Sequence, residues 1–295
     1  MYQAATTVIS SFFNGKVVIV TGSSVGIGRE TARKFAENGA KVTITGRNIA
    51  ALQETEKFCI RSGSKKGDIH IVVGDLNLKE TQESIIKETI ENFGKLDVLV
   101  NNAGAMIPNM EGKRGIDIPD EELRAVMDNN LFTCSSDNGQ SRLPNCSMVS
   151  LTRLAVPHLE TTKGAIVNVS SIAAQPHLSK DFYYNISKAA VDQLTTQLAG
   201  NLILKGIRVN SVNPGATSTE FVTRHAGEEV KQQLKAAWET PDIIPIGRMG
   251  KVEDIAKVIL FLADRSQSEF IIGQHIIVDG GSSLLNNLMC AISVF

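Results

Sequence analysis

The chain has 295 residues, of which 42% are hydrophobic and 21% charged, and its net charge is −1. This composition is ordinary for a protein that buries a full core, and the balanced charge gives no sign of a nucleic-acid or anionic-membrane surface. No run of about 18 apolar residues occurs, so we expect no membrane span. The N-terminus resembles no signal peptide and the four Cys are scattered, so we expect a cytoplasmic protein with reduced thiols.

Short apolar runs alternate with helical patterns along the chain. The apolar runs cover residues 16–20, 41–45, 69–73, 95–101, 164–170, 206–214 and 274–280. The helical patterns include one that ends at Gly39, one that ends near Arg61, and others over 81–93, 184–204 and 252–264. Strands without internal alternation, each followed by a helix, predict a parallel sheet covered on both faces. We therefore predict one α/β domain over 14–284, with tails at 1–13 and 285–295.

A polar run interrupts one of these helical patterns. Residues 134–147 read CSSDNGQSRLPNCS, and the segments on both sides have helical periodicity. Gly139 and Pro144 oppose helix continuation, and removing the run restores the apolar pattern, so we predict an inserted loop. Two interpretations stay open: a tolerated surface insertion, or an altered gene product with weakened dimerisation or activity. We predict no disulfide between Cys134 and Cys146.

The first apolar run leads directly into TGSSVGIG, residues 21–28, and a helical pattern follows. Residues without a Cβ, here Gly22, Gly26 and Gly28, let backbone approach a pyrophosphate, and the helix N-terminus offers free N–H groups. The alternative is a purely structural turn. The position in the first βα turn favours dinucleotide binding.

With this GxxxGxG spacing the chain resembles the short-chain dehydrogenase/reductase family. The resemblance continues through GDL (74–76), NNAG (101–104), YNISK (184–188) and NPG (213–215). It implies a Rossmann-like, doubly wound domain that carries both cofactor binding and catalysis. The cofactor-binding residues that it implies are Gly22, Ser23, Gly26, Ile27, Gly28, Arg47, Asp75, Leu76, Asn102, Ala103, Gly104, Tyr184, Lys188, Pro214, Gly215 and Thr219.

The end of the second apolar run bears on the choice of cofactor. An acidic residue there would bind the ribose 2′-hydroxyl of NAD, but this chain has Gly46 followed by Arg47. A guanidinium can pair with a 2′-phosphate, so the sequence favours NADP(H) over NAD(H). The alternative for Arg47 is a solvated loop cation. Val25 stands where the family often has a second basic residue.

Tyr184 and Lys188 lie four residues apart at the start of a helical pattern, so both face one side. A free Tyr has a pKa of about 10, and a nearby ammonium lowers the pKa of the phenol. Tyr183 offers no equivalent pair, because position 187 is Ser. The resemblance implies that Tyr184 is the catalytic acid-base and that Lys188 holds the ribose.

The resemblance also implies a catalytic Ser and Asn. Ser171 lies 13 residues before Tyr184, and this separation selects it over Ser170. Asn130 resembles the family residue that supports a water joined to the Lys, with Asn129 as the alternative. Ser171 and Tyr184 would bind the substrate oxygen, and no metal is needed.

These residues predict an oxidoreductase that transfers a hydride between NADP(H) and a ketone or secondary alcohol. We expect a small-molecule carbonyl or alcohol substrate, and a homodimer or homotetramer unless the insertion prevents it. The substrate pocket should be formed by residues 172–182 and about 216–245. The alternative is a catalytically weak nucleotide-binding or interaction protein, in which the 134–147 insertion disturbs subunit pairing.

Overall fold

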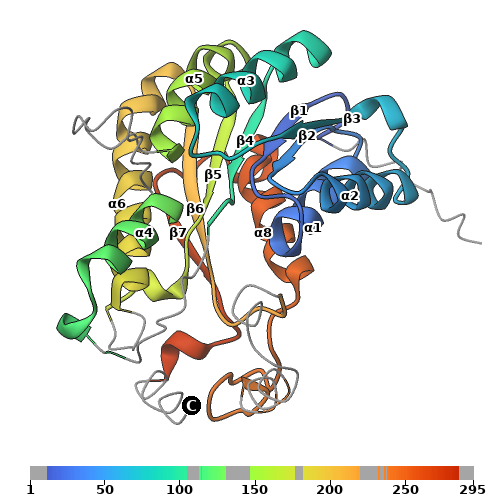
Figure 1. Cartoon of the computed structure of the whole chain (residues 1–295). Helices are drawn as coiled ribbons and strands as arrows, with labels where there is room; N and C mark the ends of the chain where they lie inside the picture. Colours follow the sequence, from blue (N-terminus) through green and yellow to red (C-terminus); the bar gives the residue numbers. More distant parts are fainter. Residues whose placement is uncertain are drawn as a thin grey trace, which may run out of the picture.

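A seven-stranded parallel sheet forms the centre of the structure (Figure 1). The computed structural model describes residues 12–104, 113, 115–130, 147–176, 182–219, 232, 236 and 238–285. The strands lie in the order β3-β2-β1-β4-β5-β6-β7, and all neighbouring pairs are parallel. Their bounds are β1 Val17–Val20, β2 Lys41–Gly46, β3 Ile69–Val73, β4 Val98–Asn101, β5 Ala165–Val169, β6 Arg208–Pro214 and β7 His275–Val278. The predicted seven-stranded parallel sheet is therefore confirmed.

Helices cover both faces of the sheet, as Figure 1 shows. One face carries α1 (Gly26–Glu37), α2 (Ile49–Arg61) and α8 (Val252–Ala263), and the other carries α3 (Lys79–Phe93), α5 (Ser147–Thr162) and α6 (Phe182–Leu202). The helix α4 (Asp120–Asn130) packs on α6. The short helices are α9 (Arg265–Ser268), η1 (Lys66–Asp68), η2 (Gly115–Asp117), η3 (Ile172–Ala174), η4 (Ile203–Lys205) and η5 (Ser282–Leu284). Among the described helices, none has the length and apolar character needed to cross a bilayer.

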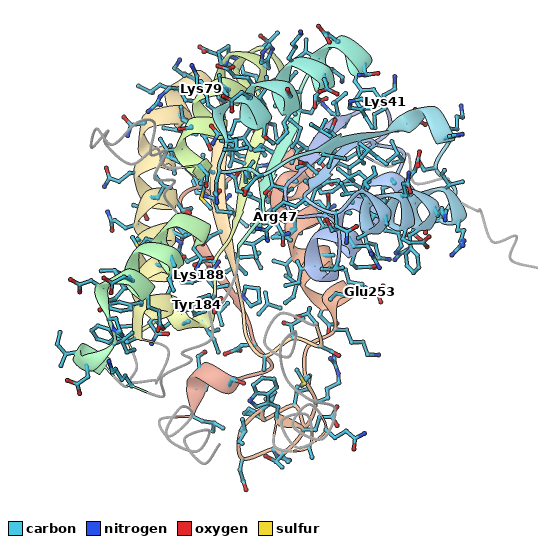
Figure 2. The ribbon with its side chains drawn as sticks, in the orientation of Figure 1. Lys41, Arg47, Lys79, Tyr184, Lys188 and Glu253 are labelled. Atoms are coloured by element: carbon cyan, nitrogen blue, oxygen red, sulfur yellow. The ribbon has the colours of Figure 1, made fainter. Side chains whose placement is uncertain are left out.

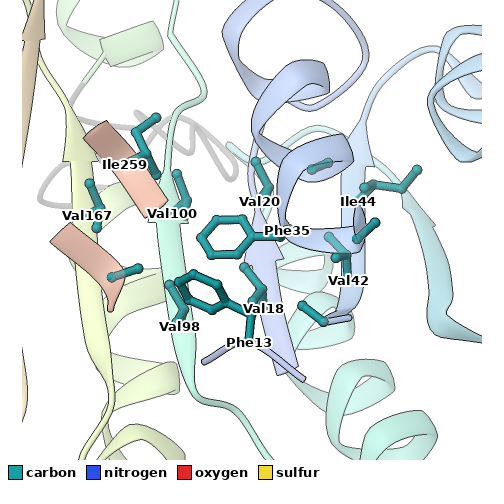
Figure 3. Close-up of a cluster of buried hydrophobic side chains, with 14 of the residues drawn as sticks. Phe13, Val18, Val20, Phe35, Val42, Ile44, Val98, Val100, Val167 and Ile259 are labelled. Carbon is teal, nitrogen blue, oxygen red and sulfur yellow. The ribbon is translucent and has the colours of Figure 1, made fainter. Parts of the chain in front are cut away.

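The apolar runs that predicted the strands are buried, because helices lie on both sides of them. All four residues of β1 are fully buried, and Phe35 of α1 packs over this strand (Figure 3). Phe13 joins the same cluster, with its ring centroid 4.8 Å from that of Phe35. Phe13 is the last residue of the N-terminal tail predicted over 1–13. It is instead a core residue, and burying an aromatic ring of this size contributes about 1.5–3 kcal/mol.

The topology brings several loops together at one edge of the sheet. Strands β1 and β4 are neighbours, and β1 leads into a helix on one face while β4 leads toward helices on the other. In parallel α/β sheets, ligands bind beyond the carboxyl ends of the strands at such a switch point. The glycine turn follows β1 and the NNAG turn follows β4, so both motifs meet there.

The interrupted helical pattern corresponds to two helices, α4 and α5. Helix α4 ends at Asn130 and α5 begins at Ser147. Ser147, which sequence analysis assigned to the inserted loop, is therefore the first residue of α5 and is buried. Residues 131–146, with Cys134 and Cys146, lie outside the described residues. Met127 of α4 and Met148 of α5 pack in one apolar cluster with Val191 of α6, so the facing ends of the two helices share a contact surface.

Candidate active site

The glycine turn needs its glycines for close backbone contact. Gly22 has a φ of +62°, and a Cβ on it would lie 2.8 Å from the Cα of Ala103. A Cβ on Gly28 would overlap the carbonyl oxygen of Gly22 and the side chain of Asn102. Gly26 has a φ of +61° and begins α1. Helix α1 has no acidic residue in its first turn and no side-chain cap. The N–H groups at such a helix start can bind an anion.

Polar side chains fasten this turn to the neighbouring strands. The amide of Asn102 donates to the carbonyl oxygens of Thr21, at 2.9 Å, and Gly22, at 3.0 Å. The Thr21 hydroxyl accepts from the backbone N–H groups of Asn102 and Ala103. Ser23 is buried, and its hydroxyl accepts from the backbone N–H of Thr45 at 2.9 Å. The side chains of Ser23 and Asn102 thus serve the shape of the turn.

Arg47 directly follows β2 and is exposed. The preceding residue, Gly46, lies so close to the Ser24 hydroxyl that a Cβ would overlap it. The end of β2 therefore touches the glycine turn, which places Arg47 beside the start of α1. Figure 2 shows Arg47 in the middle of the view, between the helices of the two faces. At the end of β3, Asp75 Oδ1 accepts from the N–H of Asn77 at 3.0 Å, and Leu76 packs on the core.

Tyr184 and Lys188 lie one turn apart on α6 (Figure 2). The Lys188 Nζ atom is 5.7 Å from the centroid of the Tyr184 ring and donates to the carbonyl oxygen of Val169 at 3.0 Å. Lys188 is 5% exposed. Burial lowers the pKa of Lys188 to about 8, and the charge of Asp192 opposes this shift. The structure thus places a buried amine beside a partly buried phenol.

The two candidate serines after β5 have different surroundings. Ser170 is buried, and its hydroxyl donates to the carbonyl oxygen of Lys188 at 3.2 Å. Ser171 is partly exposed and caps η3, with its hydroxyl accepting from the N–H of Ala173 at 3.1 Å. A hydroxyl that accepts one hydrogen bond keeps its proton for donation. Of the two serines, Ser171 is therefore the one that is accessible at the surface.

Asn130 is buried at the end of α4 and faces α6. Its Nδ2 atom donates to the Ser187 hydroxyl at 3.1 Å, and Ser187 donates to the carbonyl oxygen of Tyr184 at 2.7 Å. A Cβ on Gly104 would lie 3.0 Å from Asn130 Oδ1 and 3.6 Å from Lys188 Nζ. Gly104 thus leaves the space in which Asn130 and Lys188 come together. The side chain of Asn129, the alternative, lies outside the described residues.

The segment that follows β6 lies beside the glycine turn. Gly215 donates its N–H to the carbonyl oxygen of Val278 at 3.0 Å, and a Cβ on Gly215 would lie 2.6 Å from that of Asp279. A Cβ on Gly26 would lie 3.5 Å from Thr219 Cγ2, so Thr219 packs against the glycine turn. Pro214 is the last residue of β6 and is buried.

Two residues outside the predicted site set, Tyr183 and Asn213, hold this site in shape. Tyr183 is buried, and its hydroxyl donates to the carbonyl oxygen of Ile118 at 3.0 Å, which fixes the segment before α4. Asn213 donates to the carbonyl oxygen of Ser171 at 3.1 Å. Much of the predicted substrate pocket, including 177–181 and 220–231, lies outside the described residues. In the described part of these segments, Trp238 and Ile244 form an apolar cluster with Met249.

Residues 22–283 match the family described as enoyl-(acyl carrier protein) reductase. A short-chain dehydrogenase/reductase of unknown function from Caenorhabditis elegans, crystallised with cofactor, is 44% identical, with a TM-score of 0.85 over 93% of this chain and 97% of the other. The chain belongs to the short-chain dehydrogenase/reductase family.

Two further members of this short-chain dehydrogenase/reductase family are similar over almost the whole chain. The apo-form of glucose dehydrogenase from Caenorhabditis elegans is 43% identical, with a TM-score of 0.74, over 92% of this chain and 99% of the other. A 7α-hydroxysteroid dehydrogenase complexed with NADH and 7-oxo glycochenodeoxycholic acid is 28% identical, with a TM-score of 0.77, over 96% of this chain and 98% of the other. The family is one of oxidoreductases with the Rossmann-like fold predicted from the sequence.

Proposed function

We propose that the protein is an NADP-dependent oxidoreductase that interconverts a ketone and a secondary alcohol. The observation that carries this proposal is the buried amine of Lys188, 5.7 Å from the Tyr184 ring and close to Asn130. The pKa of this amine is lowered to about 8. Its protonation state therefore changes near neutral pH, and its charge can influence the ionisation of the neighbouring phenol. The hydroxyl of Ser171 lies at the end of the adjoining strand.

The residues around the glycine turn fit a dinucleotide. Gly22 and Gly28 leave no room for a Cβ, and the N–H groups at the start of α1 lack a side-chain cap. These features suit a pyrophosphate. The backbone of 22–28 would hold the phosphates, Asp75 the adenine, and the segment from Pro214 to Thr219 the nicotinamide. A bound nicotinamide cofactor supplies or accepts the hydride.

The other steps belong to side chains of this chain. The Ser171 and Tyr184 hydroxyls would hold the substrate oxygen, and Tyr184 would deliver the proton to that oxygen. A charged Lys188 favours the phenolate form of Tyr184, which lowers the pKa of the phenol. Its remaining N–H groups can hold the ribose hydroxyls. Asn130 would support a water that returns a proton from solvent toward Lys188.

The test of catalysis compares two neighbouring tyrosines. A panel of ketones and secondary alcohols is assayed with purified wild type, Tyr184→Phe and Tyr183→Phe. Tyr184→Phe should lower kcat by about 10²–10⁴-fold with cofactor binding intact, because only the proton is lost. Tyr183→Phe, which loses the hydrogen bond to Ile118, should melt lower but turn over substrate. Turnover by Tyr184→Phe within a few-fold of wild type would remove Tyr184 from the mechanism.

The proposed preference for NADP rests on Arg47. A solved relative is complexed with NADH, so the resemblance to known structures does not by itself favour NADP. Arg47→Asp removes a partner for the 2′-phosphate and adds an acceptor for the ribose hydroxyl. The ratio of kcat/KM for NADPH over NADH should fall by at least about tenfold, the effect of losing one charge-assisted hydrogen bond. Lys79→Asp, the same charge change at the exposed start of α3, should leave this ratio unchanged. An unchanged ratio in Arg47→Asp would contradict the assignment.

Cofactor binding without turnover on any substrate would favour the alternative, a nucleotide-binding protein of weak activity. The presence of all four predicted catalytic residues, Ser171, Tyr184, Lys188 and Asn130, supports the enzyme. We propose that it acts in the cytoplasm as a homodimer or homotetramer. Light scattering on the purified protein measures the assembly.

A further inference from the structure

A polar cluster, buried except for its histidine, lies behind the candidate active site and takes no part in the proposed mechanism. It consists of Asp192 on α6, Ser211 and Asn213 on β6, and His275 on β7; we call it the β6–β7 cluster. Asp192 is 8% exposed, and Ser211 and Asn213 are fully buried. A carboxylate so removed from water is costly unless hydrogen bonds compensate it. The partners of Asp192 therefore need an explanation.

Asn213 joins Asp192 to the candidate catalytic serine. Its Nδ2 atom donates to Asp192 Oδ2 at 2.7 Å and to the backbone carbonyl oxygen of Ser171 at 3.1 Å. An amide nitrogen has two N–H groups, so both are used in this bridge. The peptide that carries Ser171 is thus tied to α6, the helix that carries Tyr184 and Lys188.

The remaining members of the cluster, Ser211 and His275, lie near the second carboxylate oxygen of Asp192, Oδ1. Ser211 Oγ lies 3.3 Å from Asp192 Oδ1 and 2.8 Å from His275 Nδ1, and His275 Nε2 lies 3.1 Å from the Thr196 hydroxyl. The single proton of the Ser211 hydroxyl is shared between Asp192 Oδ1 and Asn213 Oδ1, which lies 2.9 Å away, and His275 Nδ1 lies 3.7 Å from Asp192 Oδ1. The parallel register places Ser211 directly opposite His275.

Asp192 also lies one helical turn after the candidate catalytic amine, Lys188. Residues 188 and 192 lie four apart on α6 and so share one side of the helix. Burial lowers the pKa of Lys188, and the negative charge of Asp192 is what opposes that shift. Since solvent is nearly excluded from Lys188, the interaction is weakly screened.

We propose that Asp192 is a positioning residue of this active site, which fixes the Ser171 peptide through Asn213 and holds Lys188 in its charged form. The inference rests on the proposed function only for its effect on turnover. The effect of Asp192 on the charge of Lys188 does not depend on the proposed function and can be measured without a substrate. An apolar residue of similar volume could fill the same space, so shape does not explain a carboxylate here.

The first experiment measures the charge of Lys188 directly. The titration of ¹³C-labelled lysine side chains is followed by NMR in wild type and in Asp192→Asn, with Lys188→Met used to assign the signal. The midpoint in wild type should lie at about 8. Asp192→Asn keeps the shape and an acceptor for Asn213 but lacks the charge, so its midpoint should be lower by about one unit. A midpoint equal to that of wild type would overturn the proposal, with or without a known substrate.

The second experiment separates charge from structure through the pH dependence of turnover. If the midpoint falls by one unit, the charged fraction of Lys188 falls about twofold at pH 7 and about fivefold at pH 8. The loss of kcat in Asp192→Asn should grow with pH in the same way. Thr195→Val is the control, because Thr195 is a buried α6 residue that accepts from Asn168 at 2.9 Å, outside the cluster. It should melt lower without a pH-dependent loss.

Asn213→Ala isolates the link to Ser171. It removes the bridge and keeps the Asp192 charge, so kcat should fall about tenfold at every pH while the Lys188 midpoint stays near 8. Wild-type kcat in Asn213→Ala would overturn the positioning of Ser171. Full activity in Tyr184→Phe would instead contradict the proposed function. In that case the titration midpoint of Lys188 would still show whether Asp192 favours the charged form of Lys188.

Discussion

The two halves of the sheet hold their polar groups in different ways. Around β1 and β2, the turn is fastened mainly to backbone: Asn102 binds the carbonyls of Thr21 and Gly22. Around β4 to β6, buried side chains bind one another, as in the chain from Asn101 through Asn168 to Thr195, with both distances 2.9 Å. We call the part around β1 and β2 the candidate cofactor half, and the part around β4 to β6 the candidate catalytic half. The first depends largely on glycines, which have no side chain, and the second on side chains that must be present.

This difference has an energetic side. A glycine turn carries no buried charge, and its cost is the conformational entropy of glycine. The catalytic half buries Lys188 and Asp192, which costs solvation free energy and is offset only by good hydrogen bonds. We therefore expect that a larger side chain in the first half disturbs the structure. In the second half, removal of a buried charge should increase the stability of the fold.

The largest expected effect comes from adding one methyl group to the cofactor half. The Cβ of Gly28→Ala would overlap the Gly22 carbonyl and the Asn102 amide, so the turn must move. Overpacking of this kind costs about 1–3 kcal/mol, and cofactor affinity should fall at least about tenfold. Gly67→Ala is the control, because a Cβ on Gly67 meets nothing within 4 Å. Equal cofactor titrations for the two variants would refute the close-packed turn.

The fold around β1 and β2 was predicted well from the sequence because its signals are local. Each strand is a short apolar run, and the glycines that permit close contact stand within a few residues of one another. Boundaries were less accurate. Helix α6 begins at Phe182 rather than Tyr184, because Phe182 and Tyr183 pack with Ile118 in an apolar cluster. Phe13 was misplaced in a tail because its partner Phe35 lies on α1, beyond any local pattern.

The catalytic half was predictable only where a motif fixes the spacing. Tyr184 and Lys188 share one helix, so their proximity follows from the helical period. The β6–β7 cluster could not be read from the sequence, because Asp192, Ser211 and His275 come from three elements and meet through strand register. A charged residue four positions after Lys188, on the buried side of the helix, was the one local signal.

The second expected effect is a gain of stability on removing the buried charge. Lys188→Met should abolish turnover but raise the melting temperature at pH 7. The lowered pKa of Lys188 means that the full cost, up to about 3 kcal/mol, is present below pH 8 and disappears as the pH rises toward 10.5. The lost hydrogen bond to Val169 offsets part of this gain. A Lys188→Met variant that melts lower than wild type at pH 7, or whose advantage does not shrink by pH 10, would show that the buried charge is not destabilising.

The smallest expected effect concerns the interrupted helix. Helices α4 and α5, on the two sides of residues 131–146, both pack against the core. Val126 and Asn130 of α4 are buried, as are Met148 and Leu151 of α5. If residues 134–147 are deleted, Met148 follows Thr133 and lies seven positions after Met127. Residues seven apart share a helix face, and both methionines already pack against Val191. The shortened chain can therefore form one continuous helix on the existing surface.

We predict that deleting 134–147 raises the melting temperature by about 2–4 °C, because one helix replaces two whose facing ends leave backbone groups outside the helical hydrogen bonds. Dimer or tetramer content should rise, and turnover should be equal or higher, because Asn130 gains a continuous support. Deleting 134–146 is the matched control: it keeps Ser147 and turns the following residues by about 100°, out of register with Met127. Thermal melts, light scattering and turnover compare the three proteins. If the 134–147 deletion melts lower than wild type and loses activity, the run is an integral part of the enzyme. If both deletions behave alike, helix register does not explain the effect.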